Sequence, residues 1–263
     1  MDLMLECKSL YFKYNKNNIL NNISFKAESG SFCALLGRNG SGKTSLIHCL
    51  NKISTPCSGR ILIDGKDISL FSRNDIAKQV SLVPQEHLDI FPYKVIDVIV
   101  MGRAPFLKIG ASPDRTDYII ANNALKDLNA ENLGKKNFNR ISGGERQIVL
   151  LARALAQATK IMLLDEPTNH LDFNNQYHLL SCIKKLCRSK GLTIIASMHD
   201  PNMAAIFADD VIMIKNGEIM TMGRAESIMT RENISKLYDT DTNAILITKT
   251  KKFFLPDYIT GDL

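Results

Sequence analysis

The residues best suited to chemistry form a glycine-rich stretch from Gly37 to Thr44, which matches the pattern GxxxxGK[ST]. Its glycines allow successive backbone N–H groups to turn inward around phosphate oxygens. Lys43 has the length to reach the β- and γ-phosphates of a nucleotide, and the Thr44 hydroxyl suits Mg²⁺. The stretch therefore predicts a nucleotide site, with a glycine-rich turn and an incidental lysine as the alternative interpretation.

The segments on either side of this stretch have the pattern that a phosphate loop needs. Ser31 to Leu36 predicts a buried parallel strand, and Thr44 to Leu50 carries apolar residues at helical spacing. A helix that begins at the loop adds unpaired N–H groups and a partial positive charge. The residues expected to contact the nucleotide here are Gly37, Arg38, Asn39, Gly40, Ser41, Gly42, Lys43, Thr44 and Ser45.

Two carboxylates follow another apolar run. Ile161 to Leu164 predicts a buried strand, so Asp165 and Glu166 should lie at its carboxyl end, where open α/β sheets hold their ligands. We expect Asp165 to bind the metal, directly or through water, and Glu166 to polarise a water for in-line attack on the γ-phosphate. Without the phosphate loop, a solvated acidic turn would be the better interpretation.

Two further polar residues also follow predicted strands. His199 comes after the apolar run Thr193 to Ser197 and is expected to sense the γ-phosphate. Gln85 comes after Ser81 to Val83 and is expected to contact the metal and the attacking water, with a plain turn glutamine as the alternative. The histidines without a strand-end setting are given no such role, namely His48, His87, His170 and His178.

A second glycine-bearing helix start lies at Ser142 to Glu145. Ser142 and Glu145 have the spacing of a capping box, which is the ordinary interpretation. That interpretation leaves Gly143 and Gly144 unexplained, and exposed amides at a helix start favour an anion. The chain thus carries two phosphate-binding helix ends but one loop lysine. We therefore expect the second end to bind the nucleotide of another subunit.

Strands alternate with helices along most of the chain, which favours an α/β fold with a mainly parallel sheet. Met4 to Tyr14 and Ile19 to Phe25 predict an antiparallel hairpin, and Val211 to Met222 predicts another that turns at Asn216-Gly217. We expect a single domain over residues 1–263, with a core in 1–85 and 140–230, a mainly helical insertion in 86–139 and a small C-terminal appendage in 231–263. In the helix that begins after Asp114, one apolar face is predicted to contain Tyr118, Ala121, Leu125 and Leu128.

Composition narrows the functional classes. The chain has 263 residues, is 45% hydrophobic and lacks an apolar run of the roughly 18 residues that a membrane span needs, so we expect a globular protein that stays in the cytosol. The six cysteines form no CxxC pair and are interpreted as reduced core thiols. The net charge of +6 comes without a dense basic run, which favours a solvated surface and no nucleic-acid partner.

Together these motifs, in this order, resemble those of ABC-transporter ATPase subunits, a P-loop NTPase family. The resemblance extends from about Met4 to Pro256 and includes the signature stretch Ile141 to Gln147 and the pair Leu171-Asp172. It implies a RecA-like core with an antiparallel β subdomain, ATP and Mg²⁺ as ligands, and a head-to-tail homodimer that drives a membrane permease. It also implies that Tyr14 stacks on adenine, although an ordinary strand aromatic is the alternative, and that Asp172 contributes to the nucleotide site. The residues around Gln85 to Phe106 resemble the part that receives the permease.

A narrower likeness concerns the cargo. The stretches Phe91 to Tyr93, Met101 to Arg103, Leu171 to Gln176 and His199 to Asn202 are similar to ATPases of iron-chelate, haem and cobalamin importers. The likeness implies uptake of a metal chelate, ferric siderophore or haem foremost, with an external substrate-binding protein as an indirect partner and the cytoplasmic membrane face as the location. The alternatives are ATPases for cobalamin, molybdate or metal import or for export, and a soluble ABC ATPase acting on nucleic acid. Two departures from the pattern, Ile141 and Ile148, remove no phosphate contact.

Overall fold

The computed structural model describes residues 3–85, 92–246 and 252–256 and centres on a six-stranded sheet in the order β10-β9-β3-β8-β7-β6. Its strands are β3 (Phe32–Leu36), β6 (Val80–Val83), β7 (Ile161–Leu164), β8 (Thr193–Met198), β9 (Asp210–Lys215) and β10 (Glu218–Arg224). All neighbouring strands are parallel except β9 and β10, which form the hairpin predicted around Asn216-Gly217. The expected mainly parallel sheet is confirmed.

A second, antiparallel sheet has the order β2-β1-β4-β5. Its strands are β1 (Leu3–Tyr14), β2 (Asn17–Glu28), β4 (Ser58–Ile63) and β5 (Lys66–Asp67). The hairpin of β1 and β2 confirms the prediction and extends beyond it on both strands. Between β4 and β5, Asp64 and Gly65 have φ angles of 50° and 73°, the left-handed conformations that a two-residue hairpin turn requires.

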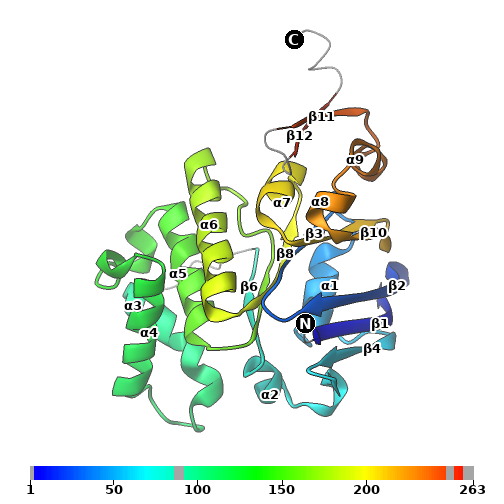
Figure 1. Ribbon diagram of the computed structural model, residues 1–263. Helices are drawn as coiled ribbons and strands as arrows, with labels where there is room; N and C mark the ends of the chain where they lie inside the picture. The colour runs from blue at the N-terminus through cyan, green and yellow to red at the C-terminus, as the bar shows by residue number, and fades with distance from the viewer. Residues whose placement is uncertain (1–2, 86–91, 247–251, 257–263) are drawn as a thin grey trace.

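The central strand β3 is buried on both faces, as expected for a parallel strand covered from two sides. Cys33 and Leu35 lie in an apolar cluster shared with the antiparallel sheet and with α1 (Lys43–Leu50). The other three residues of β3 lie in a larger cluster on the opposite face, which α5 (Gly143–Ala156), α6 (Phe173–Lys190) and α7 (Pro201–Phe207) cover. Figure 1 shows these helices on one side of the sheet and α1 with the hairpin on the other.

The chain between β6 and α5 is mainly helical over its described residues, 92–139. Its helices are α3 (Val95–Val100), η2 (Met101–Phe106), α4 (Arg115–Asp127), η3 (Glu131–Leu133) and η4 (Phe138–Arg140). Both α3 and α4 pack against α5, which places this segment far from the antiparallel sheet (Figure 1). The remaining part of the predicted insertion, residues 86–91, lies outside the described residues and includes His87 and Phe91.

The prediction of the apolar face of α4 is wrong at one position. The other three predicted residues are buried, but Tyr118 is 38% exposed and its hydroxyl donates a hydrogen bond to Asp97 Oδ1 at 3.3 Å. The buried position in this turn belongs to Asp117, whose carboxylate lies 3.0 Å from Arg103 Nε. An ion pair that the apolar spacing does not reveal therefore fixes the rotation of this helix.

The cysteines are free thiols, as expected, but they do not all belong to the core. Cys182 is half-buried and Cys57 is exposed, while the other four are buried. The core interpretation is therefore wrong for Cys57, because this residue lies in the loop before β4, outside any apolar periodic segment. Burial raises the pKa of the Cys7 thiol to about 12, so it stays protonated at neutral pH.

The chain after the central sheet adds α8 (Ala225–Ile228), α9 (Arg231–Tyr238) and an antiparallel pair, β11 (Thr242–Leu246) and β12 (Lys252–Pro256). The strand β12 packs against α7. In Figure 1 these elements lie together at the end of the molecule where β11 and β12 are labelled. Between β5 and β6 in the chain are two short helices, η1 (Ile68–Leu70) and α2 (Arg73–Ala77), and α2 begins with a capping box of Ser72 and Asp75.

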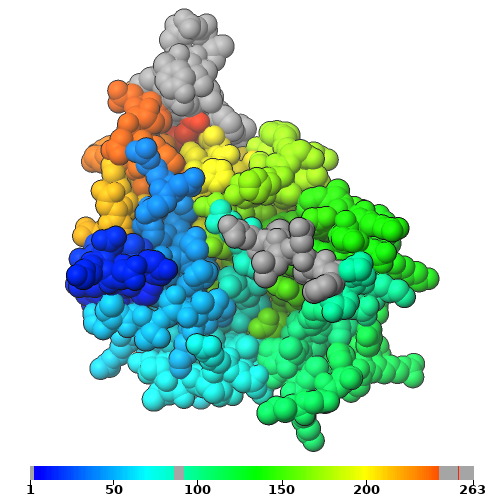
Figure 2. Space-filling model, turned by 180° about the vertical axis from the view of Figure 1, so that it is seen from behind, coloured from blue at the N-terminus to red at the C-terminus, as the bar shows by residue number. Residues whose placement is uncertain are grey.

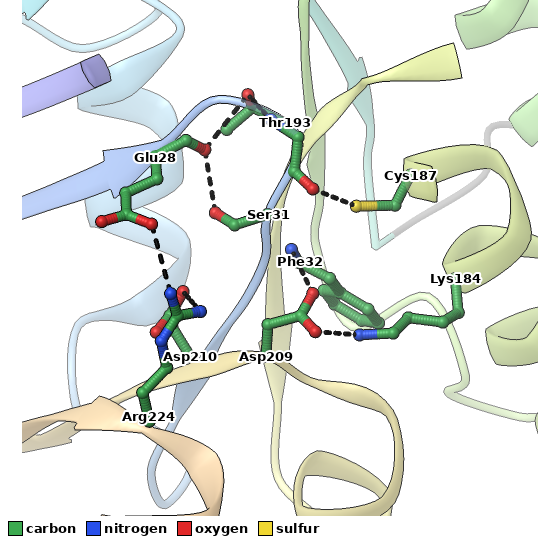
Figure 3. A network of polar contacts seen from close by, with 10 residues as sticks. Glu28, Ser31, Phe32, Lys184, Cys187, Thr193, Asp209, Asp210 and Arg224 are labelled. Carbon is green, nitrogen blue, oxygen red and sulfur yellow. Dashed lines mark hydrogen bonds and ion pairs between the residues drawn. The ribbon is translucent and has the colours of Figure 1, made fainter. Parts of the chain in front are cut away.

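A polar network holds together the amino edge of the central sheet, as Figure 3 shows. The Asp209 carboxylate accepts a hydrogen bond from the Phe32 backbone N–H at 3.0 Å and lies 2.5 Å from Lys184 Nζ. Arg224 pairs with Glu28 at 3.3 Å. Because the predicted ligand-binding residues follow the carboxyl ends of the strands, this network lies at the opposite edge and stabilises the fold.

Candidate functional site

The glycine-rich loop connects β3 to α1 at the carboxyl edge of the sheet. Gly42 has a φ of 104°, which L side chains rarely adopt, and it directly precedes the first residue of α1. At Gly37 a Cβ atom would lie 2.4 Å from the Ile214 carbonyl oxygen on β9. Only glycine therefore fits at Gly37, and the loop is packed between its own strand and the neighbouring one.

The Lys43 side chain is 4% exposed and folds back along the loop. Its Nζ donates hydrogen bonds to the carbonyl oxygens of Gly37, at 2.8 Å, and Arg38, at 3.1 Å, and lies 3.7 Å from Glu166 Oε1. Burial lowers the pKa of Lys43, and the nearby carboxylates of Glu166 and Asp165 counteract part of that shift. The ammonium is thus a fixed, poorly solvated cation beside the loop.

Asp165 is 2% exposed and joins three segments. Its Oδ1 accepts hydrogen bonds from the hydroxyls of Thr44, at 3.2 Å, and Ser197, at 2.6 Å. The structure therefore brings together two predicted metal-binding residues from α1 and the end of β7. Ser197 is a residue that sequence reasoning missed; the signal was its place in β8, two residues before His199.

Glu166 has a φ of 46°, an uncommon conformation for a residue with a side chain. Its backbone N–H donates to Ser197 Oγ at 2.7 Å, while its Oε2 accepts from Gln85 Nε2 at 2.9 Å and lies 3.5 Å from Asn169 Nδ2. Gln85 and Glu166, predicted from separate strands, are thus in direct contact. Asn169 was missed, and its polar type in a loop gave no distinguishing signal.

An open pocket of about 400 Å³ lies over these groups. Its lining residues are Ile19, Asn39, Gly40, Gly42, Lys43, Thr44, Ser45, Gln85 and Glu166. The Ser41 hydroxyl next to it is buried and has no hydrogen-bond partner among the described residues. A buried lysine, glycine amides, hydroxyls and a buried carboxylate together form a donor and acceptor set that fits a triphosphate with a divalent metal ion.

Tyr14 and His199 lie outside this lining. Tyr14 is the last residue of β1 and is 69% exposed. His199 directly follows β8 and is also exposed, and its carbonyl oxygen accepts a hydrogen bond from the Tyr238 hydroxyl at 2.5 Å. Both side chains are accessible to a ligand on the surface, but within one chain the structure does not bring them into the pocket.

The second glycine-bearing helix start forms the predicted capping box. Ser142 Oγ accepts from the Glu145 N–H at 3.2 Å, Glu145 Oε2 accepts from the Ser142 N–H at 2.9 Å, and Lys136 pairs with Glu145 at 2.9 Å. A Cβ on Gly143 would meet only open space. Ser142 and Gly143 are exposed and Gly144 is half-buried, so this helix tip lies at the surface, where an anion could reach it.

Asp172 caps α6 and lies near this helix tip. Its carboxylate accepts hydrogen bonds from the Asn175 N–H, at 2.9 Å, and from Asn175 Nδ2, at 2.8 Å. The same Asn175 amide packs on Gly144, where a Cβ would approach it to 2.8 Å. None of Ser142, Gly143, Gly144, Glu145 and Asp172 lines the phosphate-loop pocket, so one chain presents two separate groups of predicted nucleotide-binding residues.

Comparison with known proteins identifies the family. A family model described as ABC transporter matches residues 20–169, more than half of the chain. The chain belongs to the ABC transporter ATP-binding family. The matched range includes the phosphate loop, the signature helix start and the Asp165-Glu166 pair. As a member of this family the protein is an ATP hydrolase, of a class that works together with membrane permease subunits.

Several relatives match almost the whole chain. An ATP-binding protein of Helicobacter pylori assigned to iron chelatin transport is 37% identical, covering 92% of this chain and 96% of its own length. The molybdate import ATP-binding protein MolC of Haemophilus influenzae is 34% identical, covering 90% and 89%. A solved structure assigned to a metal-chelate type ABC transporter in an inward-facing conformation is 31% identical, covers 99% of both chains and has a TM-score of 0.87. In the part of the chain that the structure describes, no helix has the length and apolar character to cross a membrane.

Proposed function

We propose that this protein is the ATPase subunit of an importer that takes up a metal chelate, with ferric siderophore or haem as the foremost cargo. The observation that carries the proposal is the likeness over 99% of both chains to a transporter assigned to the metal-chelate type. The iron chelatin relative supports the same cargo class. Molybdate is the second candidate, because MolC is 34% identical to this chain.

We propose a head-to-tail homodimer as the working assembly. One chain carries two groups of nucleotide-binding residues that do not meet, namely the phosphate-loop pocket and the helix tip of Ser142 to Gly144. Two copies related by a two-fold axis would bring each pocket against the other copy's tip, which makes two equivalent sites. Tyr14, His199 and Asp172, which are exposed outside the pocket, would then take the adenine and γ-phosphate contacts expected of them.

Within each proposed site, the contacts support the following roles. Lys43 and the loop amides bind the β- and γ-phosphates, and Glu166 acts as the general base for the attacking water, with Gln85 holding its second carboxylate oxygen. Thr44, Asp165 and Gln85 would hold Mg²⁺, which supplies charge neutralisation on the phosphates when bound. A single buried carboxylate suits Mg²⁺, since this ion commonly takes one or two carboxylates plus phosphate oxygens.

We propose the helical insertion as the surface that receives the permease, at the cytoplasmic face of the membrane. Its exposed large apolar side chains include Tyr93, Met101, Phe106 and Ile109. The Arg103 guanidinium lies 4.1 Å from the centre of the Phe106 ring, which holds the ring in place. We further propose that the chain forms one domain. Its parts are a core (1–85 and 140–230), an insertion (86–139) and an appendage (231–263).

The deciding experiment is reconstitution with the permease. The protein and its co-purified permease would be placed in lipid vesicles and tested with ferric siderophore, haem, cobalamin and molybdate, each with its binding protein. We expect ATP-dependent uptake and stimulated hydrolysis with an iron chelate. Uptake of molybdate alone would replace the cargo, ATP-driven efflux would make the protein part of an exporter, and stimulation by DNA or RNA would refute a transport role.

A further inference from the structure

The C-terminal segment makes direct contacts with the nucleotide site, although its sequence carries none of the site's motifs. Its helix α9 ends at Tyr238, and the Tyr238 hydroxyl donates to the His199 carbonyl oxygen at 2.5 Å. Burial raises the pKa of the Tyr238 phenol, and the Asp200 carboxylate adds to the shift. The hydroxyl is therefore protonated, and remains a donor, throughout the physiological pH range.

A second contact binds the same loop a few residues further on. The Asn202 side chain bonds the Phe254 backbone in both directions: its Oδ1 accepts from the Phe254 N–H at 2.6 Å, and its Nδ2 donates to the Phe254 carbonyl at 3.2 Å. Phe254 itself is buried in the larger apolar cluster. The chain from His199 to Asn202 is thus held at both ends by elements that follow residue 230.

A third contact reaches the phosphate loop. Asp239, with a φ of 52°, lies 2.5 Å from Lys215 Nζ and 3.3 Å from Arg38 Nη1. Lys215 Nζ also donates to the Lys236 carbonyl at 2.5 Å, which caps the end of α9. In Figure 2 the blue surface that follows β3 reaches the orange surface of the C-terminal segment. The Arg38–Asp239 pair is exposed and contributes little by itself. The pair does, however, place the end of α9 beside the phosphate loop.

We infer that Tyr238 is a positioning residue for ATP hydrolysis, which fixes the backbone of His199 so that the imidazole meets the γ-phosphate in the right place. The inference rests on the proposed role of His199. The Tyr238 and Asn202 contacts hold the loop that carries His199, the Asp239 contact holds the phosphate loop, and the Tyr238 contact joins a half-buried donor directly to the backbone of the sensing residue. Through Tyr238, Asp239 and Phe254 the C-terminal segment therefore supports the hydrolytic site.

The test compares Tyr238→Phe with Ser235→Ala. Ser235 lies on the same helix and its hydroxyl hydrogen-bonds to the Thr242 hydroxyl at 3.0 Å, and within the described part of the chain it has no hydrogen bond to the nucleotide site. Both variants lose one hydroxyl, but the Ser235 hydroxyl also accepts a hydrogen bond from the Thr242 N–H at 3.2 Å, so Ser235→Ala should lose at least as much thermal stability as Tyr238→Phe. We expect Tyr238→Phe to lower kcat roughly five-fold with KM for ATP unchanged, the effect of losing one typical hydrogen bond, and Ser235→Ala to retain wild-type kcat.

Two further variants, Asn202→Ala and His199→Ala, distinguish a wrong role for Tyr238 from a wrong role for His199. Asn202→Ala, which breaks the Phe254 contact, should also lower kcat without changing ATP affinity, and it replaces Tyr238→Phe as the test if that variant does not fold. In single-turnover hydrolysis with excess protein, Tyr238→Phe should have no further effect when combined with His199→Ala. If His199→Ala alone leaves hydrolysis intact, the role proposed for His199 is wrong. If His199→Ala is slow but Tyr238→Phe and Ser235→Ala behave alike, the positioning role of Tyr238 is refuted while the proposed function stands.

Discussion

Ser197 should contribute more to both stability and catalysis than an ordinary buried serine. Its hydroxyl donates to Asp165 Oδ1 at 2.6 Å and accepts from the Glu166 N–H at 2.7 Å. Replacing Ser197 by alanine deprives a buried carboxylate of one donor, a loss of about 1.5 to 3 kcal/mol, and leaves the Glu166 N–H without its acceptor, a loss of about 1 to 3 kcal/mol. Because the two losses share one relaxed site and do not fully add, we expect roughly 3 kcal/mol of destabilisation.

The matched control is Ser81→Ala. Ser81 is also a fully buried serine of the same sheet, and among the described residues its hydroxyl bonds neutral groups, Thr159 Oγ1 at 3.0 Å and the Ile161 carbonyl at 3.5 Å. Its loss should cost about 1 kcal/mol. At about 2 to 4 °C per kcal/mol for a chain of this size, Ser197→Ala should lower Tm by about 6 to 12 °C and Ser81→Ala by about 2 to 4 °C.

The two variants should differ even more in activity. The Ser197 bond holds the backbone of Glu166 in its uncommon left-handed conformation, and a small displacement of a catalytic group can cost up to about 100-fold in rate. We expect kcat to fall roughly ten-fold or more in Ser197→Ala and to stay near wild type in Ser81→Ala. Urea unfolding and steady-state ATP hydrolysis measure both quantities. Equal effects of the two substitutions on both would refute the role assigned to Ser197.

Three other predictions concern named charges. Glu166→Gln should bind ATP, lose hydrolysis and accumulate as an ATP-bound dimer in size-exclusion chromatography; steady turnover would remove Glu166 from its role. Lys43→Ala should bind ATP roughly 10- to 100-fold more weakly in titration calorimetry, because a charge-assisted contact of about 1.5 to 3 kcal/mol is lost. Burial raises the pKa of Asp209, but the hydrogen bonds from Lys184 and a backbone N–H outweigh this, so the pKa lies below its usual value. The ionised Asp209 therefore stabilises the fold above the unfolded pKa, and this contribution disappears as the pH falls through the folded pKa. Asp209→Asn should be about 1 kcal/mol less stable at pH 7, with the difference shrinking below about pH 4; a difference independent of pH would contradict the linkage.

Local patterns predicted much of the fold because the relevant structure is itself local. The buried strand β3, the glycine loop and α1 are consecutive in the chain, so apolar spacing and glycine positions were sufficient to predict them. The same holds for the capping box at Ser142. The apolar face of α4 was partly mispredicted because Asp117 is buried against Arg103, fourteen residues away, and hydrophobic spacing carries no information about such a pair.

The sequence predicted which residue types lie at the strand ends of the site. It did not predict the contacts between them. That Gln85 and Glu166 touch follows from the order of β6 and β7 in the sheet, which the sequence does not state. The turn at Asn216-Gly217 was predicted, but not its place against the phosphate loop, where the Gly217 N–H donates to the Ser41 carbonyl at 3.1 Å. Tyr238 had no signal at all, because its partner is a backbone carbonyl, which every residue carries.

The contacts also connect the two groups of predicted nucleotide-binding residues within one chain. The path begins at Glu166, whose carboxylate lies next to the Asn169 side chain. Further along the same loop, Gln176 Nε2 donates to the Leu171 carbonyl at 3.0 Å, which fixes the part of the loop that carries Asp172. From Asp172 the path continues through Asn175 to Gly144 at the signature helix tip. In the proposed homodimer that tip contacts the other copy's nucleotide. The homodimer proposal therefore predicts that a displacement of the loop after Glu166 in one site reaches the second site along this path of packed and hydrogen-bonded groups.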